Sequence, residues 1–252
     1  MKYSKLSLAA IIISSVAILI SLAAIAIGSF AVFASFRIIR GNGDIVPSER
    51  IVPAFEKINI RGSTHVRFHI SQEHRVVVTT DSNIIEFVTT TVRNNTLNIG
   101  IESGNYSFTK LTVDVYSPVL TGVSISGSGR FSSNDTITVP VFETNVSGSG
   151  TITAIVESET FSSRVSGSGR MIVSGNSNDS NIVISGSGRF NGNEFINNNA
   201  DVNISGSGTV NIFVTNNLNA RVSGSGRINY RGNPSSVNAN VSGSGRINRS
   251  DL

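Results

Sequence analysis

The 252-residue sequence contains no cysteine and no tryptophan, and only 14% of its residues are charged. The absence of cysteine excludes disulfides, thiolate chemistry and a lipoprotein anchor, which requires an acylated cysteine. Aromatic residues make up 7% of the chain, which disfavours a surface on which nucleic-acid bases stack. The formal net charge is +4, whereas nucleic-acid-binding proteins usually gather a larger basic excess on one face. We therefore expect no nucleic-acid partner. The chain is long enough to bury a core without a metal or a disulfide.

Charged residues are also missing from the 31-residue stretch Leu6 to Phe36. At about 1.5 Å per residue, a helix of this length exceeds the hydrocarbon core of about 30 Å. The sequence therefore predicts one N-terminal transmembrane helix within residues 1–40, either an anchor or an uncleaved signal. A cleaved signal peptide stays an alternative, because small-residue sites occur at residues 24–26 and 31–34. We expect a single-pass protein of the cell membrane with its β domain extracytoplasmic, in the periplasm or at the cell surface.

The rest of the chain has the pattern of strands rather than helices. Residues 41–53 contain Gly, Asn, Pro and Ser and are interpreted as a linker. From there on apolar and polar residues alternate, for example in His65–Ile70, which is typical of half-buried strands. Turn residues separate the strands, as at residues 93–95. Residues 54–118 are therefore predicted to be an N-terminal β part of a larger domain.

Between Ser126 and Gly245 the tetrapeptide Ser-Gly-Ser-Gly occurs seven times, each time after Val or Ile, at steps of 18 to 21 residues. A repeat at nearly constant period indicates a solenoid, in which each unit packs on its neighbours. Leucine-rich repeats have a similar period but need a leucine framework, and propeller blades need about 40 residues each. We predict an all-β fold for residues 119–252, a single-stranded parallel β-helix of about 19-residue rungs, with two strands and two turns per rung.

Stacking of the rungs assigns a structural role to each part of the motif. The residues before it are expected to form one buried column: Ile125, Val146, Val165, Ile184, Ile204, Val222 and Val241. Glycine permits a positive φ or a close backbone approach, so the glycines of the motif are predicted to form the structural turns. They are Gly127, Gly129, Gly148, Gly150, Gly167, Gly169, Gly186, Gly188, Gly206, Gly208, Gly224, Gly226, Gly243 and Gly245.

The residue after the motif is the sharpest candidate for a site. It is arginine in five repeats, at Arg130, Arg170, Arg189, Arg227 and Arg246, and threonine in two, at Thr151 and Thr209. Superposed corners would place these guanidinium groups in a row, about 4.8 Å apart from rung to rung. Such a row could bind anionic glycans, lipid head groups or an acidic protein surface through forked hydrogen bonds. The alternative is a solvated edge whose charges prevent sideways aggregation.

Several segments, in a fixed order along the chain, resemble those of a known family. They are Phe55–Gly62 (FEKINIRG), Val113–Leu120 (VDVYSPVL) and Val123–Gly129 (VSISGSG). Between about Val52 and Ile247 the chain resembles the bacterial family named putative auto-transporter adhesin, head GIN domain (domain of unknown function 2807). The resemblance implies a β-helix of the cell envelope or surface with an adhesin-like role, and it brings no catalytic residues. The chain departs from that family in its long N-terminal hydrophobic segment and its regular arginines.

Catalytic and metal-binding candidates are weak. Glu157 and Glu159 would lie on one strand face about 7 Å apart, which fits a pair of glycosidase carboxylates loosely. His65 and His69 would lie about 13 Å apart on the polar face of a strand, too far to share one metal ion, and His74 is expected at the surface beyond them. We therefore predict no enzyme, no cofactor and no metal.

The sequence favours a non-enzymatic, membrane-anchored, adhesin-like binding module of the cell envelope. The expected partners are the membrane and either an anionic glycan or an envelope protein. A passive structural protein without a ligand and a carbohydrate-active β-helix enzyme are the alternatives. Residues 246–252 would leave strand edges uncovered, so we also expect self-association through the C-terminal rungs.

Overall fold

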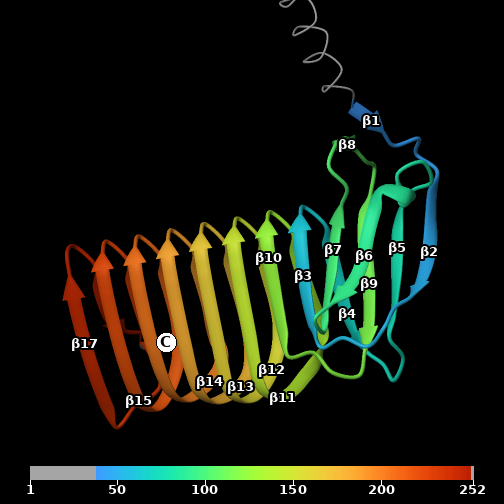
Figure 1. The fold of residues 1–252 in the computed structure, drawn as a ribbon. Helices are drawn as coiled ribbons and strands as arrows, with labels where there is room; N and C mark the ends of the chain where they lie inside the picture. The colour runs from blue at the N-terminus through green and yellow to red at the C-terminus, as the bar shows by residue number, and fades with distance from the viewer. Residues whose placement is uncertain (1–37, 251–252) are drawn as a thin grey trace, which may run out of the picture. The chain divides into compact units, whose positions relative to one another are not determined.

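The computed structural model describes residues 38–250, and in these residues the fold is all-β with one short 3₁₀ turn (Figure 1). The N-terminal strands are β1 (Ile38–Arg40), β2 (Ile45–Ile51), β3 (Lys57–Gly62), β4 (His65–Ile70), β5 (Arg75–Asp81), β6 (Val88–Arg93), β7 (Thr96–Ile101), β8 (Asn105–Ser107) and β9 (Leu111–Ser117), with the 3₁₀ turn η1 (Ile85–Phe87) between β5 and β6. The repeat region contributes β10 (Gly122–Gly127), β11 (Arg130–Gly148), β12 (Thr151–Gly167), β13 (Arg170–Gly186), β14 (Arg189–Gly206), β15 (Thr209–Gly224), β16 (Arg227–Arg231), β17 (Ser236–Ser242) and β18 (Arg246–Arg249).

The repeat region forms the predicted parallel solenoid, and Figure 1 shows its rungs side by side in chain order. Every pairing from β10 to β18 is parallel. Each long strand, such as β12, runs around a whole rung from one Ser-Gly-Ser-Gly corner to the next. In β11 to β15 the predicted second turn is therefore a bend within one strand, whereas residues 232–235 separate β16 from β17 in the next rung. Register shifts near this bend, as between Ile172 and Ser174 of β13, absorb the differences in rung length.

The N-terminal part joins the same sheet in mixed directions. β3 and β4 act as the two halves of a first rung, because β3 pairs with β10 and β4 with β11, both in parallel. Antiparallel pairs follow, β6 with β7 and β5 with both β9 and β2. The predicted turn before β7 is present, with Asn94 and Asn95 at φ values of 50° and 59°. The segment 41–53, predicted as a linker, contains strand β2, because its residues 45–51 pair along β5.

The core is a row of stacked apolar columns. The expected column before each corner is buried from Ile125 to Val222, whereas its last member, Val241, is 41% exposed. Phenylalanine rings link rungs that are not adjacent, since Phe195 of β14 lies 4.9 Å from Phe161 of β12, between ring centroids. The small Ser180 of the intervening strand β13 lies opposite Phe161, which leaves room for this contact. Self-association through the C-terminal rungs stays a prediction.

The two glycines of each corner have different tasks. Gly148 has a φ of +116°, and a Cβ on it would lie 2.6 Å from the carbonyl oxygen of Gly127 in the preceding rung. Gly150 has no such backbone conformation, but a Cβ there would lie 2.7 Å from Cγ2 of Ile125. Backbone hydrogen bonds stack the corners, as from Ser149 N to Gly127 O at 2.9 Å. Glycine is thus required first for backbone conformation and then for close packing.

The segments at the N-terminus and around β8 stand apart from the solenoid sheet. Strands β1 and β8 form a separate two-stranded parallel sheet, with Ile38 opposite Asn105. The transmembrane helix predicted within residues 1–40, with its uncharged stretch Leu6–Phe36, lies outside the described residues except for 38–40. Among residues 38–250, no helix is both long and apolar enough to cross a membrane.

Candidate functional site

The residues that follow the corners form one continuous column across the solenoid, named here the arginine column. Its members lie opposite one another in the parallel register, in the order Arg130, Thr151, Arg170, Arg189, Thr209, Arg227 and Arg246. Strand spacing gives about 29 Å from the first member to the last. The structure therefore assembles the predicted row of arginines, while its binding role stays a prediction.

The column faces outward because the next residue of each strand faces the core. Phe131, Met171 and Phe190, for example, are at most 1% exposed, and the arginines before them are exposed. Within residues 38–250, none of the five column guanidinium groups has an ion pair or a hydrogen bond to another residue. Arginine donors that the protein itself leaves unused are available to an anionic ligand.

Small polar side chains flank the arginine column on both sides. Two residues before each member lies the exposed second serine of the motif, a serine row made of Ser128, Ser149, Ser168, Ser187, Ser207, Ser225 and Ser244. Two residues after each member lies a second row, named here the polar row, which is polar except for Ile172 and is made of Ser132, Thr153, Ile172, Asn191, Asn211, Asn229 and Asn248. Two internal hydrogen bonds use amides of this row, since Asn229 Nδ2 donates to Asn211 Oδ1 at 2.8 Å and Asn191 Oδ1 accepts from Asn193 N at 3.4 Å. The site is therefore a basic strip between hydroxyl and amide groups.

His65 continues the arginine column toward the N-terminal part. It pairs with Arg130 in register, and the next residue beyond it, Thr112, has its hydroxyl buried. Burial lowers the pKa of His65, and the charges of Arg130 and Arg67 lower it further, against an opposing effect of Asp114. The alternation of residues in the β4 sequence predicts an outward His65, but the sequence does not reveal which strand β4 pairs with. The sequence alone therefore missed this residue as a member of the column.

An ionic cluster lies beside His65 on the same face. Asp114 accepts hydrogen bonds from Arg67 at 2.6 Å and from His69 at 3.2 Å. Burial alone would raise the pKa of the Asp114 carboxyl, but the hydrogen bonds from Arg67 and His69 outweigh it, so this pKa is lowered. The His69 ring stacks on Tyr116, with centroids 4.9 Å apart, and Arg75 covers Tyr116 at 3.9 Å. Asp114 is thus a neutralised carboxylate, and His69 lies at the surface in contact with Asp114 and Tyr116.

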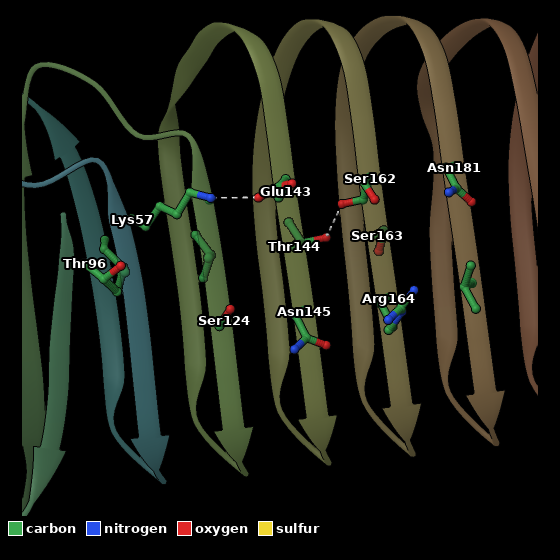
Figure 2. A pocket seen from close by; sticks show the side chains of 14 residues that line it. Lys57, Thr96, Ser124, Glu143, Thr144, Asn145, Ser162, Ser163, Arg164 and Asn181 are labelled. Carbon is green, nitrogen blue, oxygen red and sulfur yellow. Dashed lines mark hydrogen bonds and ion pairs between the residues drawn. The ribbon is translucent and has the colours of Figure 1, made fainter. Parts of the chain in front are cut away.

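The opposite sheet face carries a hollow of about 390 Å³ across β3, β10, β11, β12 and β13 (Figure 2). Lys57 and Glu143 lie on either side of Gly122 in register, and their 2.8 Å ion pair spans the gap that this glycine leaves (Figure 2). Thr144 donates to the carbonyl of Ser162 at 3.3 Å. Since the lysine and the glutamate of the hollow pair with each other, it presents less unpaired charge than the arginine column.

The weaker sequence candidates do not assemble into a reaction centre. Glu157 and Glu159 are both exposed on β12, and Glu157 accepts a 3.4 Å hydrogen bond from Thr138. His74 packs edge-on against Phe55, and its Nδ1 lies 3.2 Å from Ser117 Oγ, so it is partly buried. Within residues 38–250, no group of three or more His, Asp or Glu side chains has the geometry to hold a metal ion.

The fold and this surface identify the class of protein as a parallel β-solenoid that presents a long basic strip among polar side chains. The chain belongs to the family described as putative auto-transporter adhesin, head GIN domain, whose model matches residues 54–234. This confirms the resemblance seen in the sequence. A comparison with curated proteins finds no match.

Solved bacterial structures share the fold. A putative adhesin from Bacteroides fragilis has a TM-score of 0.81 at 21% identity, covering 84% of this chain and 100% of its own. A structure from Parabacteroides distasonis, described as a putative lipid-binding protein, has a TM-score of 0.73 at 24% identity, covering 85% and 100%. A putative adhesin from the same organism has a TM-score of 0.72 at 24% identity, with the same coverage. Identities this low show a common fold, and these relatives are described as adhesins or a lipid-binding protein, not as enzymes.

Proposed function

We propose that the protein is a non-enzymatic, adhesin-like binding module of the cell envelope. In this proposal the N-terminal segment tethers it to the membrane, and the arginine column binds an anionic envelope ligand outside the cytoplasm. The single observation that carries the proposal is the in-register column of five arginines without partners among residues 38–250. A structural edge needs charge but not a straight row of unpaired guanidinium groups. Membership of the family described as putative auto-transporter adhesin, head GIN domain, supports the same class of function.

The test measures binding of the full-length chain, in a mild detergent, to immobilised heparin as a model anionic polysaccharide. Changing Arg170, Arg189 and Arg227 to Ser should weaken binding roughly tenfold at low salt, because each exposed ion pair contributes about 0.2–1 kcal/mol. The slope of log affinity against log salt concentration should also fall, since fewer charges are neutralised on binding.

A matched control removes three arginines from the opposite face. Arg61, Arg164 and Arg221 are exposed, lie outside the column, and carry the same total charge, with Arg221 3.7 Å from Asp201 Oδ1. Their change to Ser should reduce heparin affinity much less. Equal losses in both triple variants would mean that net charge alone explains binding, and unchanged binding in the column variant would favour the passive structural alternative.

The location outside the cytoplasm has its own test. Protease treatment of intact cells, followed by mass spectrometry, should release peptides from residues 54–252 and identify the mature N-terminus. A protected β domain would contradict display at the cell surface, and protection that ends when the outer layer is opened would place the domain in the periplasm.

A further inference from the structure

The complete outward column contains three basic pairs separated by single threonines. With His65 included, the register reads His65, Arg130, Thr151, Arg170, Arg189, Thr209, Arg227 and Arg246, here called the track. His65 and Arg130 make the first pair. Beyond His65, the next residue in register is Thr112, an uncharged residue with a buried hydroxyl, so the basic row ends at His65. The track is about 34 Å long at about 4.8 Å per step. A straight row of this length fits an extended polymer better than a compact anion.

The chemistry around the track favours a polymer rich in hydroxyl groups. The serine row and the polar row offer hydroxyl and carboxamide groups on both sides, which can donate to and accept from sugar hydroxyls. Ile172, at 37% exposed, is the one apolar side chain among the described members of the track, the serine row and the polar row. A lipid surface would require apolar side chains to insert, and single-stranded nucleic acid would require aromatic side chains for stacking.

The negative charge near the track comes from Asp114 and from the exposed Glu194, which lines a hollow together with Thr153, Ile172 and Asn191 of the polar row. Among the strand residues in register with the polar row, Arg67 and Asp114 extend it beyond Ser132, and Asp114 is held by Arg67 and His69. The charged groups that face His65 are Arg130 from β11, Asp114 from β9, and Arg67 from its own strand, and its Nε2 lies 3.4 Å from Ser132 Oγ. Two of these three are cations, so His65 is surrounded by net positive charge that an anionic ligand would offset.

We propose that the track binds a single linear acidic glycan along the axis of the solenoid, and that protonation of His65 strengthens binding at the end formed by β4 and β11. This proposal rests on the proposed function of the arginine column and specifies its ligand and regulation. Guanidinium groups take the acidic groups of the glycan in forked hydrogen bonds, and the threonine positions leave gaps for neutral sugar units. Protonated His65 adds a sixth cation to the five arginines.

The first experiment varies ligand length, using heparin oligosaccharides of defined size with the full-length chain. Affinity should increase with each added disaccharide until the oligosaccharide spans about 34 Å, and then level off. An affinity that is already maximal for the shortest oligosaccharide would overturn axial binding of a polymer.

The second experiment varies pH, since heparin sulfate groups stay ionised from pH 5 to pH 8. Because the pKa of His65 lies below its ordinary value of 6.5, affinity should increase as pH falls below that value, by roughly threefold for one added exposed ion pair. His65→Gln should abolish this increase. His74→Gln, at a histidine outside the track, should keep the increase, and a variant His65→Gln that still shows it would overturn the role of His65.

The outcomes separate this proposal from the proposed function. If the triple arginine variant loses heparin binding but neither length nor pH matters, the arginine column binds anions and the axial glycan proposal is wrong. Binding to vesicles of anionic phosphatidylglycerol that exceeds binding to the longest oligosaccharide, with the same dependence on the column arginines, would replace the glycan by a lipid surface.

Discussion

At the scale of single residues, three buried side-chain atoms have no hydrogen-bond partner in the described chain, Thr112 Oγ1, Ser163 Oγ and Asn219 Oδ1, and Ser163 is the most deeply buried of the three residues. Ser163 is 1% exposed, and its Oγ has no hydrogen-bond partner. It lies between Thr144 and Ile182 in an inward column, where an apolar side chain would fit. A buried hydroxyl without a partner loses its hydration and gains nothing in exchange.

We predict that Ser163→Ala raises the free energy of unfolding by about 1 kcal/mol. Urea unfolding followed by circular dichroism measures the change. The matched control is Ser180→Ala, because the Ser180 hydroxyl is also buried but donates to Asn197 Oδ1. That change should lower the free energy of unfolding by about 1 kcal/mol. Destabilisation by both changes would mean that Ser163 has a partner after all.

At the scale of structural elements, the corner depends on two glycines for different reasons. Gly148 needs a φ of +116°, which side chains rarely adopt, and its neighbour is the fixed backbone of Gly127. Gly150 is limited by the side chain of Ile125 and by the carbonyl of Gly129. A mutation can shorten the Ile125 side chain but cannot remove the backbone of Gly127. A second mutation at Ile125 should therefore relieve a substitution at Gly150 but not one at Gly148.

We predict that Gly148→Ala and Gly150→Ala each lower the free energy of unfolding, by about 1–3 kcal/mol or more. Adding Ile125→Ala should recover part of the loss in Gly150→Ala, with a coupling of about 0.5–3 kcal/mol in a double-mutant cycle. It should recover nothing in Gly148→Ala.

Gly100→Ala serves as the control for the glycine series. A Cβ at Gly100 meets ordinary contacts at 3.5 Å and beyond, and its φ is not positive, so we expect nearly unchanged stability. Equal rescue of both corner variants by Ile125→Ala would contradict the division of tasks between the two glycines.

At the scale of the whole molecule, the strands of each rung in the repeat region pair only with those of neighbouring rungs, while side chains such as Phe161 and Phe195 make contact one rung further on. Sheet order follows chain order from β10 to β15, so rungs resemble units in a one-dimensional stack. Removal of residues 151–169 would join Gly150 to Arg170 and delete one complete rung. We predict that this variant still folds as a β-protein with a lower thermal midpoint, because one rung-to-rung interface is lost.

The control for the rung deletion removes residues 151–160, about half a rung. This deletion places inward residues out of register with the next rung, so it should abolish cooperative unfolding. Circular dichroism and thermal scans compare the two. A rung-deletion variant that is as unfolded as the half-rung variant would contradict the picture of independent stacked units.

The sequence predicted much of the arginine column because its members recur at one place in the repeat. Arg170 and Arg189, for example, each follow directly after a Ser-Gly-Ser-Gly motif. Because the motifs of successive rungs pair with each other, the residues after them pair as well. The N-terminal part offers no such repetition. His65 is distant in sequence from both Arg130 and Thr112. It lies between them in the column only because β4 pairs with β11 on one side and with β9 on the other.

The sequence by itself determined the solenoid, its rung length, the buried column before each corner and the outward row of arginines. These follow from local rules, the two-residue period of a strand and the glycine demand of a tight corner, repeated seven times. Tertiary structure alone decided how the non-repetitive strands join the stack, that the second corner is a bend inside one strand in β11 to β15, and that a histidine extends the basic row. Strand pairing over long sequence separations depends on the packing of the whole core, and a local pattern does not record it.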